Sequence, residues 1–272
     1  MNAEKAFFQE NGYILIKKVY DKYDISAYRK RFVSIFEKEL WKKSRYNSPT
    51  IINDIYQLFP DLLNIIINEN YINAIKKILG EEVVWLPECA IHHNRYINWH
   101  KDTTEQEIKG LQSHKVQHEF LIQSATYFQD NSSAGGGITV IPKSHLGFKE
   151  DKFKNLYRKQ LHYRVHNKIK KTLKISPFDK ADRNKNSFQI PNEVGDLLLF
   201  DVRIDHKSSG GKCIENQKFA IFNTFGNANN FTKDYLLFMK NRPEPYYEHL
   251  RNTKFAKNLY HKAQSLNIKI WE

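Results

Sequence analysis

Two histidines and one aspartate form the pattern in this sequence with the clearest chemistry. His100 and Asp102 are separated by one residue, so an extended segment would point both side chains to the same face. An imidazole and a carboxylate placed in this way can bind one metal ion from one side. His206 follows the apolar run from Leu197 to Phe200, and we expect it at the rim of the same core. Two imidazoles and one carboxylate leave three metal positions open, which is typical of non-haem Fe(II) oxygenases and unlike a closed structural zinc site.

The other histidines are expected to have simpler roles. His145 follows Pro142-Lys-Ser and is predicted to be a turn residue that bonds to the backbone. His92 and His93 lie in a predicted strand, where they could belong to the core or to a pocket. Five others have polar or basic neighbours and are expected on the surface: His114, His162, His166, His249 and His261.

The first eighty residues are predicted to be mainly helical. Apolar side chains recur with helical spacing from Asp24 to Lys43. Pro60-Asp61 indicates the start of a second helix, from Leu62 to Leu79, which Gly80 would end. A short strand is expected from Gly12 to Ile16.

The following part of the chain changes to short apolar or alternating runs separated by turn signals. These runs are Val83 to Trp85, His118 to Phe128, Gly137 to Ile141, Asp196 to Asp201 and Phe219 to Phe225. Such spacing favours an antiparallel jelly-roll sandwich over a parallel α/β sheet. We therefore expect one domain over residues 1–272 of the α+β class, mainly β, with helices at the N-terminus. It would have a helical buttress (1–80), a jelly-roll core (81–226) with a basic insert (149–190), and a helical C-terminal extension (227–272).

Composition and charge limit the classes of function. The 272 residues carry 43 Lys+Arg against 30 Asp+Glu, a net charge of +13, which favours anionic partners. Residues 149–174 contain ten basic and two acidic residues, so this stretch is either a solvated lysine-rich face or a binding surface. Two cysteines exclude a disulfide framework, and no apolar run is long enough to span a membrane. The start of the sequence lacks the pattern of a secretion signal, which predicts a cytoplasmic protein.

Five segments, in order, resemble the phytanoyl-CoA dioxygenase (PhyH) family of Fe(II)/2-oxoglutarate oxygenases. They cover roughly residues 7 to 226. The first, Phe7-Phe8-Gln-Glu-Asn-Gly12-Tyr-Ile-Leu-Ile16, is similar to the family's N-terminal strand, and the second, Trp99-His100-Lys101-Asp102, looks like its WHxD motif. The others are Tyr127-Phe-Gln-Asp-Asn131, Gly136-Gly-Ile-Thr-Val-Ile-Pro142-Lys-Ser-His145 (similar to a stretch ending in PGSH), and Gly195-Asp-Leu-Leu-Leu-Phe-Asp201 with His206.

The resemblance implies a double-stranded β-helix in which His100, Asp102 and His206 bind Fe(II). It further implies 2-oxoglutarate and O2 as cosubstrates, with succinate and CO2 as products, and it admits ascorbate as an auxiliary cofactor. Halogenating relatives carry a small residue in place of Asp102, so the carboxylate favours hydroxylation or a related oxidation.

The same resemblance predicts the groups around the metal. The family's cosubstrate-binding arginine corresponds to Lys218, and an ammonium lacks the bidentate fork of a guanidinium. Gln123 is a candidate cosubstrate contact, and His93 or Arg95 could line the pocket. The basic stretch favours a small anionic substrate, with Lys168, Lys170 and Lys171 as candidate contacts.

Two alternatives to this oxygenase remain open. One is a metal-free sandwich that binds nucleic acid or another anionic polymer through the basic stretch and its aromatic residues, although no nucleic-acid-binding signature is present. The other is a jelly-roll metalloprotein that binds iron but not 2-oxoglutarate.

Overall fold

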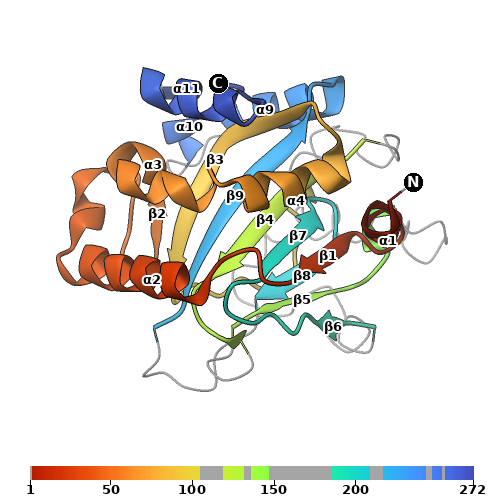
Figure 1. The fold of residues 1–272 in the computed structure, drawn as a ribbon, viewed down its shortest axis with the longest axis horizontal. Coiled ribbons are helices and arrows are strands. Elements are labelled where there is room, and N and C mark those ends of the chain that lie inside the picture. Colours follow the sequence, from red (N-terminus) through yellow and green to blue (C-terminus); the bar gives the residue numbers. More distant parts are fainter. Residues whose placement is uncertain are drawn as a thin grey trace, which may run out of the picture.

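The computed structural model describes residues 2–104, 119–131, 136–146, 186–208, 217–242, 247–252 and 255–272. Two β-sheets form its centre (Figure 1). The larger has the strand order β1-β7-β4-β9-β3-β10, with β2 also paired to β3, and the smaller has the order β6-β5-β8. All pairings are antiparallel except that of β10 with β3. This arrangement confirms the predicted jelly-roll core.

Six strands (β1, β3, β4, β5, β7 and β9) overlap the segments expected from the apolar runs, whereas the short strands β2, β6, β8 and β10 were not predicted. Their bounds are β1 Tyr13–Ile16, β2 Ile51–Asn53, β3 Val83–His93, β4 Leu121–Tyr127, β5 Ile138–Val140, β6 Phe188–Gln189, β7 Leu197–Asp201, β8 His206–Ser208, β9 Phe219–Asn227 and β10 Ile268–Ile270.

The helices precede and follow this core. The N-terminal ones are α1 Ala3–Asn11, α2 Lys22–Glu37, α3 Ile55–Leu58 and α4 Glu69–Leu79, with 3-10 turns η1 Leu40–Lys43 and η2 Pro60–Ile65. A further 3-10 turn, η4, spans Ser144–Leu146. The C-terminal helices are α9 Asn230–Lys240, α10 His249–Asn252 and α11 Lys257–Ser265.

Two helix predictions were wrong in extent. The helix expected from Leu62 begins only at Glu69, because the side chain of Asn68 accepts a hydrogen bond from the backbone N–H of Tyr71 and caps a new helix there. The helix expected to reach Lys43 ends at Glu37, since Glu39 adopts a left-handed φ of 50° and a separate 3-10 turn follows.

One face of the large sheet packs against the N-terminal helices (Figure 1). This outer face contributes Trp85, Ile91, Ile122 and Phe225, which lie in a continuous apolar core with side chains from α2, η2 and α4. Edge-to-face and stacked aromatic contacts strengthen the core; the rings of Phe32 and Phe128, for example, have centroids 4.5 Å apart. The predicted helical buttress therefore covers this face of the sheet.

The opposite, inner face of the large sheet has two neighbours. Residues such as Ala125, Leu198 and Phe222 pack with Ile138 and Val140 of the small sheet. Farther along the strands, Val84 and Leu121 are grouped with Phe231, Tyr235 and Met239 of α9. The candidate ligands are positioned on this inner side.

The C-terminal tail contains a strand that the sequence did not predict. β10 pairs in parallel with β3, with Ile268 opposite Val83, and the backbone N–H of Trp271 donates to the carbonyl of Trp85. Helix α11 and β10 therefore complete the edge of the large sheet. In the part of the chain that the structure describes, no helix is both long and apolar enough to cross a membrane.

Candidate metal centre

A short backbone bridge brings the candidate ligands together. His100 and His206 exchange two backbone hydrogen bonds, each with an N–O distance of 2.9 Å, and so form an isolated antiparallel bridge. The backbone N–H of Asp102 donates to the carbonyl of Val202 at 3.0 Å. The extended segment that carries the His-x-Asp pair is therefore fixed to the chain between β7 and β8.

The three side chains converge, as their spacing predicted. One ligand atom from each of His100, Asp102 and His206 lies within 4.8 Å of the other two. Nε2 of His100 is 3.4 Å from Oδ1 of Asp102, and Nε2 of His206 is 3.9 Å from the same oxygen. The two imidazole rings have centroids 4.2 Å apart. This geometry suits one small metal ion bound on one face.

Backbone carbonyls fix the orientation of both imidazoles. Nδ1 of His100 lies 2.7 Å from the carbonyl oxygen of Asn98, and Nδ1 of His206 lies 3.1 Å from that of Ile204. Because a carbonyl oxygen only accepts, Nδ1 of each ring donates to it, and Nε2 is the nitrogen that faces Asp102. Metal-binding histidines in proteins are held by this kind of outer hydrogen bond. The donor set therefore fits a divalent transition metal.

The charges of the cluster also favour metal binding. Burial lowers the pKa of His206 to about 4, with the charge of His100 acting in the same direction, so the ring is neutral at pH 7. Burial raises the pKa of Asp102, but the charges of His206 and His100 outweigh it and the pKa is lowered overall. For His100, burial lowers the pKa, whereas the hydrogen bond and charge of Asp102 raise it above its usual value. A neutral His206 and an ionised Asp102 are the forms that coordinate metals.

Lys218 lies at the start of β9 in an aromatic environment. Its ammonium nitrogen is 4.8 Å from the ring centroid of Tyr96 and 5.7 Å from that of Tyr127. Only 3% of the residue is exposed, and burial lowers the pKa of Lys218 to about 8. Gly136 has a φ of 86°, and a Cβ there would lie 2.6 Å from Cδ of Lys218. A glycine at this position therefore leaves room for the buried lysine side chain.

The family of the chain follows from its sequence as a whole. A family model, phytanoyl-CoA dioxygenase (PhyH), matches residues 8–212. The chain belongs to the PhyH family. Members of this family are non-haem Fe/2-oxoglutarate-dependent oxygenases, so the predicted family is confirmed.

Solved structures with the same fold share little sequence with this PhyH protein. EctD from S. alaskensis, crystallised with 2-oxoglutarate and 5-hydroxyectoine, has a TM-score of 0.58 and 16% identity over 85% of this chain and 77% of its own. SnoK, an alpha-ketoglutarate-dependent carbocyclase from nogalamycin biosynthesis, has a TM-score of 0.55 and 17% identity over 84% of this chain and 85% of its own. The epimerase SnoN of the same biosynthesis has a TM-score of 0.55 and 11% identity over 83% of this chain and 80% of its own. Among curated proteins, no sequence matches the chain.

The other predicted site residues of the PhyH chain fall into three groups. Gln123 lies on the inner face, opposite Phe200 and Thr224, and its buried Oε1 has no hydrogen-bond partner in the described ranges. Arg95 follows β3 and is close enough to His92 for its charge to act there. The predicted substrate contacts Lys168, Lys170 and Lys171 lie outside the described residues.

The two histidines at the end of β3 lie on opposite faces. His93 stacks on Phe219 at 5.0 Å and contacts Phe36 on the outer face, so it does not line the metal site. His92 is on the inner face, where burial, together with the charges of Arg95 and Lys218, lowers its pKa to about 3.

Two further histidines can be compared with their predictions. His145 lies in η4 with Nε2 3.0 Å from the carbonyl oxygen of Gln9, which confirms a turn residue that bonds to the backbone. His249 was expected on the surface but is 2% exposed, packed near Tyr46 with Nε2 4.0 Å from a carboxylate oxygen of Asp54. The prediction failed because α10 folds back onto the core.

Sequence reasoning did not single out Tyr127 and Glu88, which the structure makes candidate site residues. The hydroxyl of Tyr127 is buried, and the structure shows no hydrogen-bond partner for it among the residues it describes. The signal for Tyr127 was its place four residues after Gln123 on one strand, which sets both on the same face. The signal for Glu88 was a carboxylate inside the otherwise apolar run from Val83 to Ile91.

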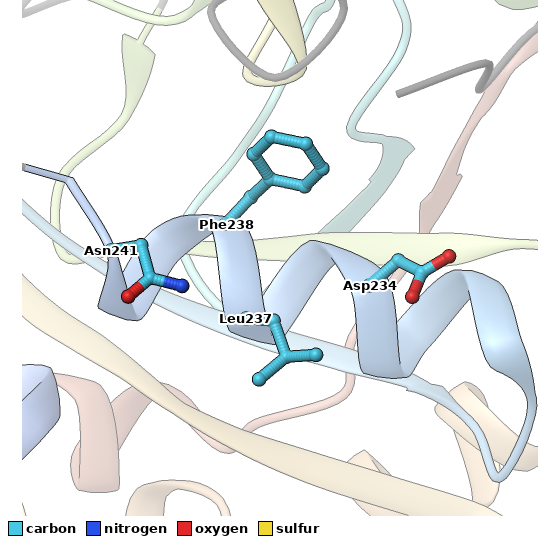
Figure 2. Close-up of a pocket in the computed structure, with 4 residues that line it drawn as sticks. All are labelled: Asp234, Leu237, Phe238 and Asn241. Carbon is cyan, nitrogen blue, oxygen red and sulfur yellow. The ribbon is translucent and has the colours of Figure 1, made fainter. Parts of the chain in front are cut away.

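A hollow on the surface of α9 is separate from this site. It is lined by Asp234, Leu237, Phe238 and Asn241. Figure 2 shows Leu237 and Phe238 projecting from α9 in opposite directions, with Asp234 and Asn241 about one turn away on either side. The lining holds one carboxylate and no histidine or cysteine, so it offers no ligand set comparable with the triad.

Proposed function

We propose that the protein is a non-haem Fe(II)/2-oxoglutarate-dependent dioxygenase that hydroxylates, or otherwise oxidises, a C–H bond of a small substrate. One observation carries the proposal. The three ligand atoms lie within 4.8 Å of one another, and backbone carbonyls hold Nδ1 of both imidazoles, so that Nε2 of each ring faces the carboxylate of Asp102. His100, Asp102 and His206 would hold the iron and leave three positions open for cosubstrate and O2.

The bound iron would supply oxidation of the substrate by O2, coupled to conversion of 2-oxoglutarate to succinate and CO2. The residues of the protein would bind and orient the substrate and the cosubstrate, and they would exclude water from the site. Asp102 offers a carboxylate ligand, which favours hydroxylation or a related oxidation over halogenation.

Lys218 and Tyr127 are the proposed contacts for the far carboxylate of 2-oxoglutarate. A buried ammonium lying 5.7 Å from the ring centroid of Tyr127, whose hydroxyl is itself buried, makes two donors for one anionic group. Lys218 acts as a point charge where an arginine would form two parallel hydrogen bonds. Gln123, four residues before Tyr127 on the same face of β4, is the proposed third contact.

We further propose an anionic substrate, because ten of the basic residues lie together in residues 149–174. Lys168, Lys170 and Lys171 are its proposed contacts. Replacing the three lysines by glutamate should raise KM for the substrate and leave substrate-independent succinate formation unchanged. An unchanged KM would contradict the role of this segment.

The decisive experiment needs no substrate. Fe(II) is added anaerobically to the apoprotein, and 2-oxoglutarate is titrated while the weak visible charge-transfer band of the chelate is followed. A saturable band that is lost in His100→Ala and weakened in Lys218→Ala supports the proposal, with His261→Ala as an exposed-histidine control. Iron binding without a band would indicate a different cosubstrate. Absence of iron binding would favour an anion-binding sandwich instead.

A further inference from the structure

Glu88 is a carboxylate in the interior of β3, on the face that carries the candidate metal ligands. Its neighbours along the strand are apolar or small, and a register shift between Trp85 and Cys89 interrupts the pairing with β9 at this point. Such a bulge turns side chains relative to a regular ladder and often occurs next to active sites. The strand thus bends where its one carboxylate faces inward.

Two hydroxyl groups hold Glu88 in place. Oγ1 of Thr224 and the hydroxyl of Tyr235 donate to Oε2 of Glu88 at 2.9 and 3.0 Å. The second oxygen, Oε1, accepts no hydrogen bond from the ranges of the chain that the structure describes. The carboxylate is therefore oriented by one oxygen, while the other is available to a ligand.

The charge of Glu88 is incompletely compensated. Both hydrogen-bond donors are neutral, and the described part of the chain forms no ion pair with this carboxylate. Burial and the charge of Asp102 raise the pKa of Glu88 to about 7, because the two hydroxyl hydrogen bonds and the charge of Arg242 offset only part of the rise. A deeply placed carboxylate costs free energy unless a cation accompanies it.

Glu88 still reaches solvent despite this depth. Its side chain keeps intermediate exposure, as do those of His92, His100 and Asp102, which lie on the same inner side. The influence of Asp102 on Glu88 shows that the two carboxylates lie within electrostatic range of each other. A small molecule that approaches the metal ligands would therefore be able to meet Oε1 of Glu88.

We propose that Glu88 is a substrate-binding residue that pairs, through Oε1, with a cationic nitrogen group of the substrate. The inference rests on the proposed function, because it takes the inner face beside the triad as the substrate side. Together with the anionic character proposed above, it names the substrate class as a small zwitterion. Thr224 and Tyr235 are positioning residues for this carboxylate.

A matched set of fragments tests the inference without knowledge of the substrate. Binding of n-butylamine, 1-butanol and butyrate to the full-length metal-free protein is measured at pH 7.5 by saturation-transfer NMR with competition. The wild type should bind the amine at least about tenfold more tightly than the alcohol, because a charge-assisted hydrogen bond is the stronger one. In Glu88→Gln the preference should disappear, while affinity for the alcohol should stay the same.

Controls distinguish a lost amine preference from misfolding of the variant and from failure of the proposed oxygenase function. Glu193→Gln removes an exposed carboxylate that pairs with Lys17, at the other end of β7 from His206, and should keep the amine preference. If Glu88→Gln fails to fold, Tyr235→Phe, which removes one of the two positioning hydroxyls, takes its place and should weaken the amine preference. An amine bound no more tightly than the alcohol, or a preference that survives in Glu88→Gln, would overturn the inference. A missing charge-transfer band with Fe(II) and 2-oxoglutarate would instead contradict the oxygenase.

Discussion

The two faces of the large sheet differ in the surroundings of their polar groups. On the outer face, the hydroxyl of Tyr20 donates to the carbonyl of Ile65, and the hydroxyls of Tyr71 and Ser124 are hydrogen-bonded at 2.5 Å. Nε1 of Trp85 has no partner among the described residues, but it is enclosed in the apolar core on that face. On the inner face, the buried hydroxyl of Tyr127 and Oε1 of Gln123 have no partner among the residues that the structure describes. Buried polar atoms without partners cost stability, so the inner face retains groups that a ligand would satisfy.

This difference shows how one set of strands serves both stability and chemistry. Successive residues of a strand point to opposite faces, so β3 places Trp85 among the helices and Glu88 and His92 toward the triad. Changes on the outer face should therefore alter the free energy of unfolding. Changes on the inner face should alter ligand affinity with little cost in stability.

Trp85→Ala should have the largest effect on stability. Trp85 is fully buried in the outer core between Tyr56 and Phe255, and its removal leaves a cavity. We expect the free energy of unfolding to fall by about 3–5 kcal/mol, measured by urea denaturation. Tyr23→Ala is the control, because this ring is 86% exposed and its loss should change little. A small effect of Trp85→Ala would show that the outer face does not carry the stability.

His206→Ala should abolish the metal site and spare the fold. Loss of an outer hydrogen bond to a ligand already lowers metal affinity about 10- to 100-fold, so loss of the ligand should exceed about 100-fold. Co(II) titration followed by its visible absorption measures the affinity, and thermal unfolding checks the fold. The exposed His261→Ala should bind Co(II) as the wild type does. Equal affinity in both variants would exclude the triad as the metal site.

The affinity for 2-oxoglutarate should depend on the charge of Lys218. Burial lowers the pKa of Lys218 to about 8, so the ammonium is present below that pH and lost as the pH rises through it. We expect the charge-transfer titration to give a constant Kd up to about pH 7 and a rise of about tenfold per pH unit above the pKa. Lys218→Arg should remove this dependence, because guanidinium stays protonated. Lys207→Arg, beside Trp99, should leave it unchanged.

Tyr127→Phe should have the smallest effect and gives the sharpest contrast between the faces. Removing its unpartnered hydroxyl should leave the free energy of unfolding unchanged or raise it by up to about 1 kcal/mol, and should weaken 2-oxoglutarate binding up to about tenfold. Tyr71→Phe on the outer face loses a formed hydrogen bond, so it should be destabilised by about 1 kcal/mol with unchanged 2-oxoglutarate affinity. The reverse pattern would refute the division of roles.

Parts of this protein could be predicted because they depend on short-range patterns. The strands around Leu121–Tyr127 and Leu197–Asp201 followed from apolar runs between turn signals, and the His-x-Asp pair indicated a shared face. The break before Glu69 was missed because the Asn68 cap competes locally with a continuous helix. The strand Ile268–Ile270 was missed because three residues carry too little periodicity, and only the edge of β3 makes them a strand.

The sequence alone determined the family, the sandwich core and the three candidate ligands, because each of them depends on particular residue types at a fixed spacing. Only the tertiary structure decided which face each side chain serves. His92 and His93 are neighbours in sequence, yet one lies toward the triad and the other stacks on Phe219 among the helices. Glu88 acquired its two hydroxyl partners from β9 and α9, more than a hundred residues away. Contacts of that range depend on the register between strands and on helix docking, which no local pattern records.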